Sequence, residues 1–585
     1  MLDHRAGSSF GELFASLPFK LSSPSTILIA FSALLLVVFL KYLYSQWKSP
    51  YRHLPGPPHS SFLYGNLRDV QEDQTASIYD QWVEKYGSTF TYRGFFARRR
   101  LYTVDVRAIQ YVLNHDYDYQ KMEATRYILH VTIGDGVLAT EGDKHKTQRK
   151  IMNPAFGPAQ IREFTDVFLE KSFELRDIWI NHIMKNGEWS EIDVLAWFSK
   201  AALDIIGLAG RFSLLLSSAT MSYETDPNQL VGFNYDLNML SDSKTNSAEL
   251  QEALKMVFQL SSASKMNVLR ILQAYFPVMR VLPSAFDPGL RKAKKAMLHI
   301  GQQLLDEAKK FEIGTGQKGS SMQAKDLLSL LVKSNMSEDV TSSQRMSDED
   351  VIAQVPTVLV AGHETTATSL SWCLFALSQF PEMQNRLRDE LLSLQSNNPT
   401  MEELSSLTYL DAVVRETLRL YSPVPSPNRV AMKDDVIPLS KPFTDKYGVV
   451  HDTIEIKKGH VVTIPIASLN RDKSLWGKDA DEFKPERWFN SPEAITAIPG
   501  VWGNMLTFLG GPRSCIGWRF AVVEMKALLF TLVRTFQYEL AVPADDIIIK
   551  RMGLLQKPVV KSRITKGKER DPHMPIRVKL VKQAV

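Results

Sequence analysis

One stretch near the carboxyl end of the chain decides the fold: Phe508-Leu509-Gly510-Gly511-Pro512-Arg513-Ser514-Cys515-Ile516-Gly517, followed directly by an apolar helical pattern. A cysteine thiolate that binds a metal needs its charge stabilised, and backbone N–H groups at the start of a helix do this. Glycine lets the backbone approach a flat ligand closely, and arginine offers a fork of donors to carboxylates. The stretch therefore predicts that the sulfur of Cys515 is a metal ligand.

The same residues resemble the ligand loop of the cytochrome P-450 family, F-x-x-G-x-R-x-C-x-G. All five fixed positions match, where on the order of 10⁻⁴ chance matches are expected in this length: Phe508, Gly511, Arg513, Cys515 and Gly517. The resemblance runs from about residue 54 to the carboxyl terminus. It implies that Cys515 binds the iron of haem b (iron protoporphyrin IX), that Arg513 meets the haem propionates and that Phe508 shields the sulfur. The alternative is a buried, inert cysteine after a glycine turn.

A second motif lies inside a long apolar helix predicted over residues 348–380: Ala361-Gly362-His363-Glu364-Thr365-Thr366. It is similar to the family's A/G-G-x-D/E-T. The two small residues, Ala361 and Gly362, are expected to leave a notch beside the haem for a diatomic ligand. By resemblance, Thr365 assists oxygen activation and Glu364 relays protons for cleavage of the O–O bond. The alternative is a helix kinked at its glycine, with polar residues facing solvent.

A third pattern predicts scaffold rather than chemistry. Glu416 and Arg419 are one helical turn apart, a spacing that Glu123 and Arg126 share by chance. Only the first pair is followed by Phe483-Lys484-Pro485-Glu486-Arg487-Trp488, which resembles the family's F-x-P-E-R-F/W. The resemblance implies that Glu416, Arg419 and Arg487 form a buried structural salt-bridge triad.

Two further arginines are expected to hold haem propionates. Arg429 follows Pro423 and Pro425, as a propionate-pairing basic residue does in the family. Arg149 matches the arginine of the family's W-x-x-x-R, but His145 replaces the tryptophan. His145 is predicted to be either a second donor or an ordinary surface residue.

The amino-terminal segment predicts a membrane anchor. Residues 21–40 carry no charge and are flanked by Lys20 and Lys41; at ~1.5 Å per residue they match a bilayer core of about 30 Å. A secretory signal is the alternative, but its apolar part is usually shorter. The positives after the segment favour a single-pass anchor in the endoplasmic reticulum with a cytosolic catalytic domain. The expected organisation is residues 1–20 as a leading segment, 21–40 as the anchor, 41–66 as a proline-rich linker and 67–585 as the haem domain.

Composition excludes several classes of protein. The 585 residues are 44% hydrophobic, which suits a large core, and their formal net charge is only +5 without a concentrated basic stripe, so nucleic acid is not an expected partner. The two cysteines, Cys373 and Cys515, cannot build a disulfide framework.

The fold class expected is mainly α (α+β), with small sheets. Strands are predicted at 90–92, 101–104 and 461–464, helices over 402–420 and 516–536, and a surface loop over 314–323. Residues 211–232 are expected to be an insertion or a retained intron.

The resemblance implies a haem-thiolate monooxygenase. No dinucleotide-binding fingerprint is present, so electrons are expected from NADPH through cytochrome P-450 reductase, with cytochrome b5 as a further candidate donor. The electron-donating partner is predicted to dock at the basic residues 144, 146, 149 and 150. Residues 127–138, 424–427 and 553–556 are mostly apolar substrate-lining candidates, which favours a lipophilic substrate such as a terpenoid, sterol or fatty acid. The alternatives are an isomerase, dehydratase or peroxygenase that needs no reductase, and a non-catalytic membrane protein or haem carrier.

Overall fold

The computed structural model describes residues 24–73, 77–209, 239–240, 268–283, 287–314, 345–564 and 572–581. The chain forms two compact units, Met1–His53 and Leu54–Val585. The leading segment 1–20, the predicted insertion 211–232 and residues 315–323 of the predicted surface loop lie outside the described residues.

The first unit contains the helix α2 (Pro24–Trp47) and the short 3-10 helix η1 (Pro50–Arg52). No helix in the described part of the chain is both long and apolar enough to cross a membrane, so the predicted transmembrane helix is not found. Within α2 the charge-free run covers residues 24–40 and ends at Lys41.

The second unit is rich in helices, as predicted. They are α3 (Leu67–Glu72), α4 (Ile78–Tyr86), α5 (Val106–Asn114), α6 (Glu123–Ile133), α7 (Gly142–Met152), α8 (Pro158–Asn186), α9 (Val194–Ala209), α12 (Val268–Tyr275), α13 (Asp287–Gly314), α15 (Asp348–Ile352), α16 (Gln354–Gln379), α17 (Pro381–Ser393), α18 (Met401–Ser406), α19 (Thr408–Leu420), α20 (Ile466–Leu469), α21 (Lys473–Trp476) and α22 (Trp518–Thr535).

The strands in the described part of the chain form four small sheets. The largest has the order β1-β2-β8-β5-β3, with β1 (Thr89–Arg93), β2 (Arg99–Thr103), β3 (Tyr119–Gln120), β5 (Asn428–Ala431) and β8 (Val461–Thr463). A second has the order β4-β12-β9, from β4 (Ser190–Asp193), β9 (Phe536–Leu540) and β12 (Pro575–Leu580). Two hairpins complete the set: β6 (Asp435–Thr444) with β7 (Val450–Ile456), and β10 (Ile547–Met552) with β11 (Leu555–Val560).

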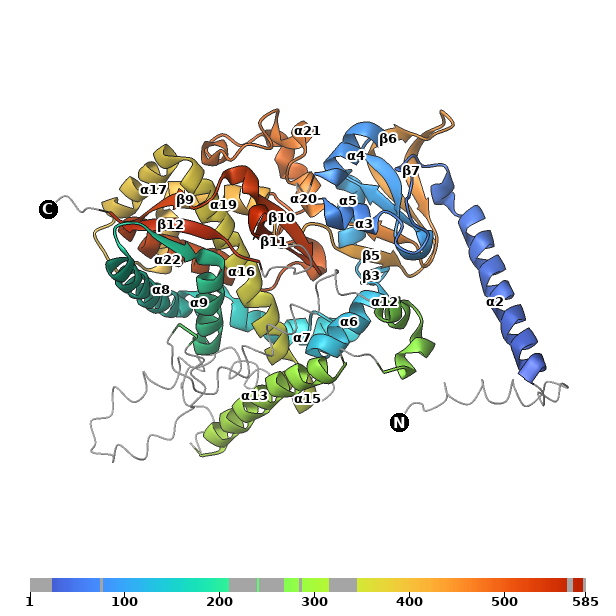
Figure 1. Ribbon diagram of the computed structural model, residues 1–585, viewed down its shortest axis with the longest axis horizontal. Helices are drawn as coiled ribbons and strands as arrows, with labels where there is room; N and C mark the ends of the chain where they lie inside the picture. Colours follow the sequence, from blue (N-terminus) through green and yellow to red (C-terminus); the bar gives the residue numbers. More distant parts are fainter. Residues whose placement is uncertain are drawn as a thin grey trace. The chain divides into compact units, whose positions relative to one another are not determined.

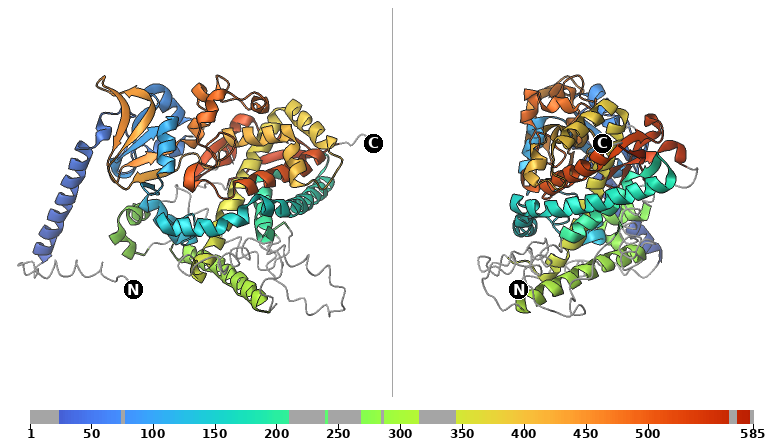
Figure 2. Two further views of the ribbon diagram at one scale, coloured as in Figure 1. Left: turned by 180° about the vertical axis from the view of Figure 1, so that it is seen from behind. Right: turned by 90° about the vertical axis from the view of Figure 1, so that its left-hand side faces the viewer.

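The helix α16 runs through the middle of the second unit (Figure 1). It contacts α9, α13, α19, α22 and the strands β9 and β11, and its second half is buried almost completely. Seen from behind, the same helix again lies between the five-stranded sheet with the β6–β7 hairpin and the helices α8, α17 and α22 (Figure 2). A helix that is apolar on most of its surface forms the core of a large domain, which is the position that α16 has.

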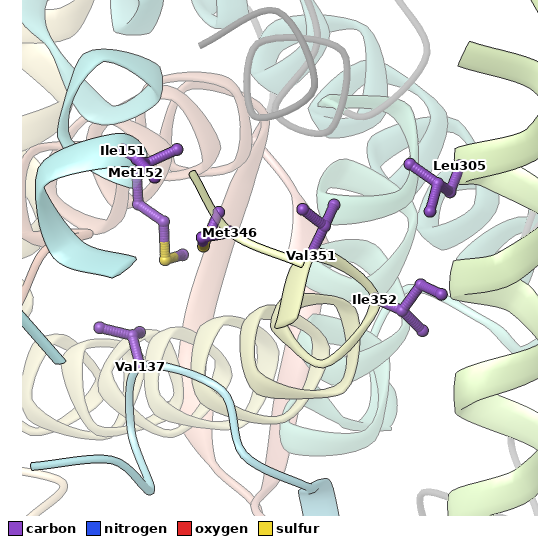
Figure 3. Packing of buried hydrophobic residues seen from close by; sticks show 7 residues of the cluster. All are labelled: Val137, Ile151, Met152, Leu305, Met346, Val351 and Ile352. Atoms are coloured by element: carbon purple, nitrogen blue, oxygen red, sulfur yellow. The ribbon is translucent and has the colours of Figure 1, made fainter. Parts of the chain in front are cut away.

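A core cluster joins the beginning of α16 to its neighbours (Figure 3). Its buried side chains come from α7, α13, α15 and two connecting segments: Val137, Ile151, Met152, Leu305, Met346, Val351 and Ile352. This packing fixes α7 against the start of the long helix, and α7 carries Arg149.

The structure differs from the sequence prediction at several boundaries. The helix predicted over 348–380 is divided at Ala353 into α15 and α16, and the helix predicted over 402–420 is divided at Leu407 into α18 and α19. The early and late predicted strands share one sheet, because β2 pairs in parallel with β8. Residues 54–66, assigned to the linker, belong to the second unit: Thr91 donates to the Pro55 carbonyl at 2.8 Å.

Candidate active site

The cysteine loop is held by close backbone packing. Gly510 lies so close to the Pro499 carbonyl that a Cβ would overlap it, and a Cβ on Gly511 would come within 2.5 Å of the Leu113 carbonyl at the end of α5. Gly511 and Leu509 both have positive φ, 68° and 57°. Only Gly511 adopts this region without strain. Backbone geometry alone therefore requires glycine at Gly510 and Gly511, independently of any need to approach a ligand closely.

Cys515 follows the 3-10 helix η10 (Gly511–Arg513), and its side chain is exposed. Its amide donates to the Phe508 carbonyl at 2.8 Å, and Phe508 itself is buried against Trp502, with ring centroids 5.8 Å apart. Desolvation of the Cys515 thiol by neighbouring protein atoms raises its pKa, while a backbone hydrogen bond at Gly517 and the charge of Arg149 lower it. The two groups that favour the thiolate are thus a helix-start amide, the kind of group that the sequence predicted, and the guanidinium of Arg149, which the sequence predicted only as a propionate contact.

Arg149 on α7 lies beside this cysteine. Its guanidinium donates to the Ser514 carbonyl and, at 3.3 Å, to the Ser514 hydroxyl. Arg149 therefore contacts Ser514, the residue that precedes Cys515 in the chain. The pKa of Arg149 is lowered, mainly by burial and to a smaller extent by the charge of Arg513.

Arg513 is the centre of a cluster of charges that we call the cation cluster: Lys121, Arg149, Arg429 and Arg513, with the carboxylates of Asp116 and Glu141. Its Nε lies 2.9 Å from Asp116 Oδ2 and its Nη2 lies 2.6 Å from Glu141 Oε2. Lys121 also pairs with Glu141, at 3.0 Å.

The cation cluster suits an anionic ligand. Four cations face two carboxylates, and burial together with mutual repulsion lowers the pKa of Lys121 to about 8 and lowers the pKa of Arg429. Arg513 Nη2 has an ion pair but no hydrogen bond of good geometry among the described residues. The excess of two positive charges matches the two propionates of a haem, so these residues fit the group that the loop motif implies.

His145 is buried, with 5% of its surface exposed, so the interpretation of His145 as a surface residue is wrong. Burial, with the charges of Arg513, Lys121 and Arg149, lowers the pKa of His145 to about 3. It is therefore a neutral side chain packed beside the cation cluster.

On α16 the polar motif bonds within the helix. Thr365 Oγ1 donates to the Ala361 carbonyl at 2.8 Å, which is the bond that a hydroxyl makes inside a helix. Ala361 is exposed. Gly362 instead packs on α9, where a Cβ would come within 2.6 Å of Ile206 Cδ1. Ala361 is thus the exposed one of the two small residues, while Gly362 is required by the contact between α16 and α9.

Glu364 forms an ion pair that the sequence did not reveal. Its carboxylate contacts the ammonium of Lys557 on β11, and the two side chains are 13% and 8% exposed. His363 Nε2 lies 3.8 Å from the other oxygen of Glu364, and its Nδ1 bonds the Leu359 carbonyl. Burial is the main reason that the pKa of His363 is lowered, so this neighbour is neutral.

A second acid lies behind the motif. Glu524 on α22 is fully buried, and both of its carboxylate oxygens lack a hydrogen bond of good geometry among the described residues. Burial raises the pKa of Glu524 well above its usual value, opposed only by the nearby hydroxyl of Thr366. Glu524 is therefore a neutral carboxylic acid.

The three residues predicted as scaffold come together away from the polar motif. Arg419 pairs with Glu416 through two bonds of 2.8 and 2.9 Å, and Arg487 Nε lies 3.4 Å from the same carboxylate. All are buried, and Arg419 also donates to three carbonyls, those of Asn470, Ala480 and Glu482. Glu123, by contrast, pairs with Arg280 and is 60% exposed.

Sequence reasoning missed Lys121, Asp116, Lys557 and Glu524. None belongs to a motif with fixed spacing, and each reaches the site only through tertiary packing. The one available signal was Glu524 itself, a carboxylate in the apolar stretch that becomes the buried face of α22.

Comparison with known proteins agrees with this geometry. The chain matches the model of the family described as Cytochrome P-450 over residues 55–561. It is 48% identical over 524 residues to cytochrome P-450 monooxygenase 205 of Postia placenta, covering 89% of this chain and 92% of the relative. Cytochrome P-450 monooxygenase 128 of the same fungus is 46% identical over 539 residues, covering 91% and 93%. Cytochrome P-450 monooxygenase claP of Ampulloclitocybe clavipes is 34% identical over 517 residues, covering 87% and 91%.

Proposed function

This chain belongs to the cytochrome P-450 family of oxidoreductases, and we propose that it inserts one oxygen atom from O₂ into a lipophilic small molecule. The overall reaction takes up two electrons and two protons and releases the other oxygen atom as water. The observation that carries the proposal is an exposed cysteine thiol beside a buried cluster with two excess positive charges.

The family implies a haem iron cofactor. In this chain Cys515 would bind the iron, and Arg149, Arg429, Arg513 and Lys121 would hold the propionates. Bound haem supplies the redox chemistry, because a thiolate ligand pushes electron density onto the iron and favours cleavage of the O–O bond. Thr365 and Glu364 would move protons at the exposed edge of α16, and Phe508 would keep water from the sulfur.

The proposed substrate is lipophilic, with a terpenoid as one candidate class. The polar motif on α16 is bordered by apolar side chains. Leu129, Ile133 and Ala139 form a cluster against Leu138 and Val360, and Val360 directly precedes Ala361. Such surroundings bind ligands mainly by burying apolar surface.

We propose an NADPH-dependent flavoprotein reductase as the electron donor, with cytochrome b5 as a second candidate. Lys144, Lys146 and Lys150 on α7 are exposed, and the same helix carries Arg149 to the cysteine loop. Lys146→Glu with Lys150→Glu should slow reduction of the protein by reductase at low salt, because opposite charges accelerate encounter. Reduction at the unchanged rate would count against docking at α7.

We propose attachment to the endoplasmic reticulum membrane through the first unit. Large apolar side chains of α2 are exposed, among them Ile29, Leu36 and Phe39 at 67%, 56% and 50%. Exposed apolar surface of this kind binds membranes or partners.

The test of the proposed function combines a spectrum with turnover. Reduced protein with carbon monoxide should show the far-red-shifted Soret band of thiolate ligation, and Cys515→Ala should abolish it, whereas Cys373→Ala should keep it. Wild-type protein with NADPH and reductase should then oxidise compounds from a library of terpenoids and fatty acids. A spectrum unaffected by Cys515→Ala would refute the proposal, and turnover without NADPH or reductase would favour the peroxygenase or isomerase alternatives.

A further inference from the structure

A buried lysine lies against the polar motif of α16. Lys557 belongs to β11, and its side chain is 8% exposed, although lysine is among the residues least often buried. The cost of removing an ammonium from water is offset when an opposite charge lies close to it. That charge is Glu364, which the Lys557 ammonium contacts directly.

The pairing of β11 with β10 adds to the free-energy cost of a lysine at position 557. In the β10–β11 hairpin Lys557 is paired with Lys550, so two like charges stand directly opposite each other on one face. Like-charge pairs across a sheet are destabilising. Hairpin stability therefore does not account for a lysine here, whereas the contact with α16 does.

The backbone around Lys557 is well anchored. Gln556 donates to the Pro423 carbonyl at 2.8 Å, and the Pro558 carbonyl accepts from the His573 amide at 3.2 Å. Both neighbours of Lys557 in the chain are thus tied to other segments. A side chain on such a support holds its partner in one place, which a lysine on a surface loop would not do.

The other groups near Glu364 cannot replace Lys557. His363 is neutral and engaged with the Leu359 carbonyl. Glu524 on α22, beside Thr366, is a neutral acid. Among the described residues, Lys557 is the one charged cation in contact with Glu364.

We propose that Lys557 is a positioning residue for oxygen activation: it holds the Glu364 side chain in place next to Thr365. The inference rests on the proposed function, in which Glu364 passes protons toward O₂. Cleavage of the O–O bond to water uses four electrons and four protons per O₂, while release of H₂O₂ uses two of each. A poorly held Glu364 should favour the second outcome, with NADPH and reductase supplying the electrons in both.

The experiment needs no identified substrate. Wild type, Lys557→Met, Lys557→Arg and the matched control Lys550→Met are mixed with NADPH, reductase and O₂, and the fraction of NADPH electrons recovered as H₂O₂ is measured. Lys557→Met should raise the ratio of NADPH electrons recovered as H₂O₂ to all other NADPH electrons at least about threefold, a modest part of what a positioned proton donor contributes. Lys557→Arg should restore the wild-type fraction, because the cation is kept, and Lys550→Met should not change it.

A second assay covers the case in which wild type already releases only H₂O₂. Oxidation of the dye ABTS driven by added H₂O₂ cleaves the same O–O bond without reductase: H₂O₂, two ABTS molecules and two protons give two radical cations and two waters. Lys557→Met should slow it at least about threefold. The carbon-monoxide spectrum of each variant checks that the haem site is intact, and Lys557→Gln replaces the methionine variant if that one loses the Soret band.

The outcomes separate the two proposals. If wild type lacks the thiolate Soret band, the proposed function fails and the inference with it. If wild type is active and Lys557→Met behaves like wild type in both assays, only the role of Lys557 is overturned. Equal losses in Lys557→Met, Lys557→Arg and Lys550→Met would likewise overturn it, because they would indicate damage to the hairpin.

Discussion

At the scale of the residue, Glu524 links burial to pH. Its pKa is raised in the folded protein, so the carboxyl stays protonated where the unfolded chain has lost its proton, above about pH 4.3. The contribution of Glu524 to the free energy of unfolding is therefore fully present below the pKa of the unfolded chain. It is lost as the pH rises through the pKa that Glu524 has in the folded protein.

We therefore expect Glu524→Gln to stabilise the protein relative to wild type, by an amount that grows from about pH 5 toward pH 8 and approaches zero near pH 4. Thermal unfolding of both proteins across this range gives the measurement. Glu170→Gln, an exposed position on α8, is the control and should show no such trend. A difference between Glu524→Gln and wild type that shrank as pH rose would contradict the assignment of a neutral acid.

The cation cluster gives a second prediction for single residues. Arg149→Met or Lys121→Met should speed loss of haem to an excess of apomyoglobin by about tenfold, the effect of ~1.4 kcal/mol. Lys146→Met is the control, since Lys146 is exposed on the same helix as Arg149. Equal rates in all three variants would show that the cluster does not hold the propionates.

Single residues were predictable from sequence only where a motif fixed their spacing. Cys515, Arg513 and Arg149 lie together as the motifs implied. Lys121 and Lys557 were not predictable, because a short strand and a hairpin bring them to the site from distant parts of the chain. Gly362 matches its motif, but the structure requires glycine there because α16 packs on α9, whereas the sequence prediction assigned it to a notch for a diatomic ligand.

At the scale of the element, the buried triad holds α19 to the segment after α21. Glu416 and Arg419 lie on α19, and Arg487 lies on η8 (Pro485–Trp488), whose neighbour Trp488 also donates to Glu416 at 3.0 Å. Removing one partner leaves a buried charge without compensation.

Arg419→Ala should therefore cost about 3–5 kcal/mol of the free energy of unfolding or prevent folding of the haem protein. The control is Arg162→Ala, which removes an ion pair with Glu402 whose side chains are 55% and 54% exposed. That variant should unfold like wild type in urea. Similar losses in the free energy of unfolding of the two variants would mean that the buried triad is no more important for stability than an exposed ion pair.

Element boundaries were less predictable than element types. The helix expected over 348–380 forms, but it is divided at Ala353, where the Ala353 amide still bonds the Glu349 carbonyl and α16 begins at the next residue. Pro356, in the first turn of α16, marks the division, because a proline has no N–H to bond the carbonyl of Ile352 and its ring crowds that carbonyl. The prediction of one continuous helix overlooked this local signal.

At the scale of the whole molecule, the boundary between the two units lies after His53. Protein lacking residues 1–53 should fold and keep the thiolate Soret band, since the core clusters lie within the second unit. The same truncation should lose flotation with phosphatidylcholine vesicles if α2 provides membrane attachment. Retained flotation would assign membrane binding to the second unit instead.

The three-stranded sheet has a consequence for biosynthesis. Its central strand β12 (Pro575–Leu580) pairs with β4 (Ser190–Asp193) on one side and β9 (Phe536–Leu540) on the other. During translation, residues 190–193 emerge long before their partner exists, so this part of the molecule stays open until almost all described residues have been synthesised. The cysteine loop emerges earlier than β12. A ribosome that stalls between these two segments would therefore hold a chain that carries the complete cysteine loop but lacks the strand that joins β4 to β9.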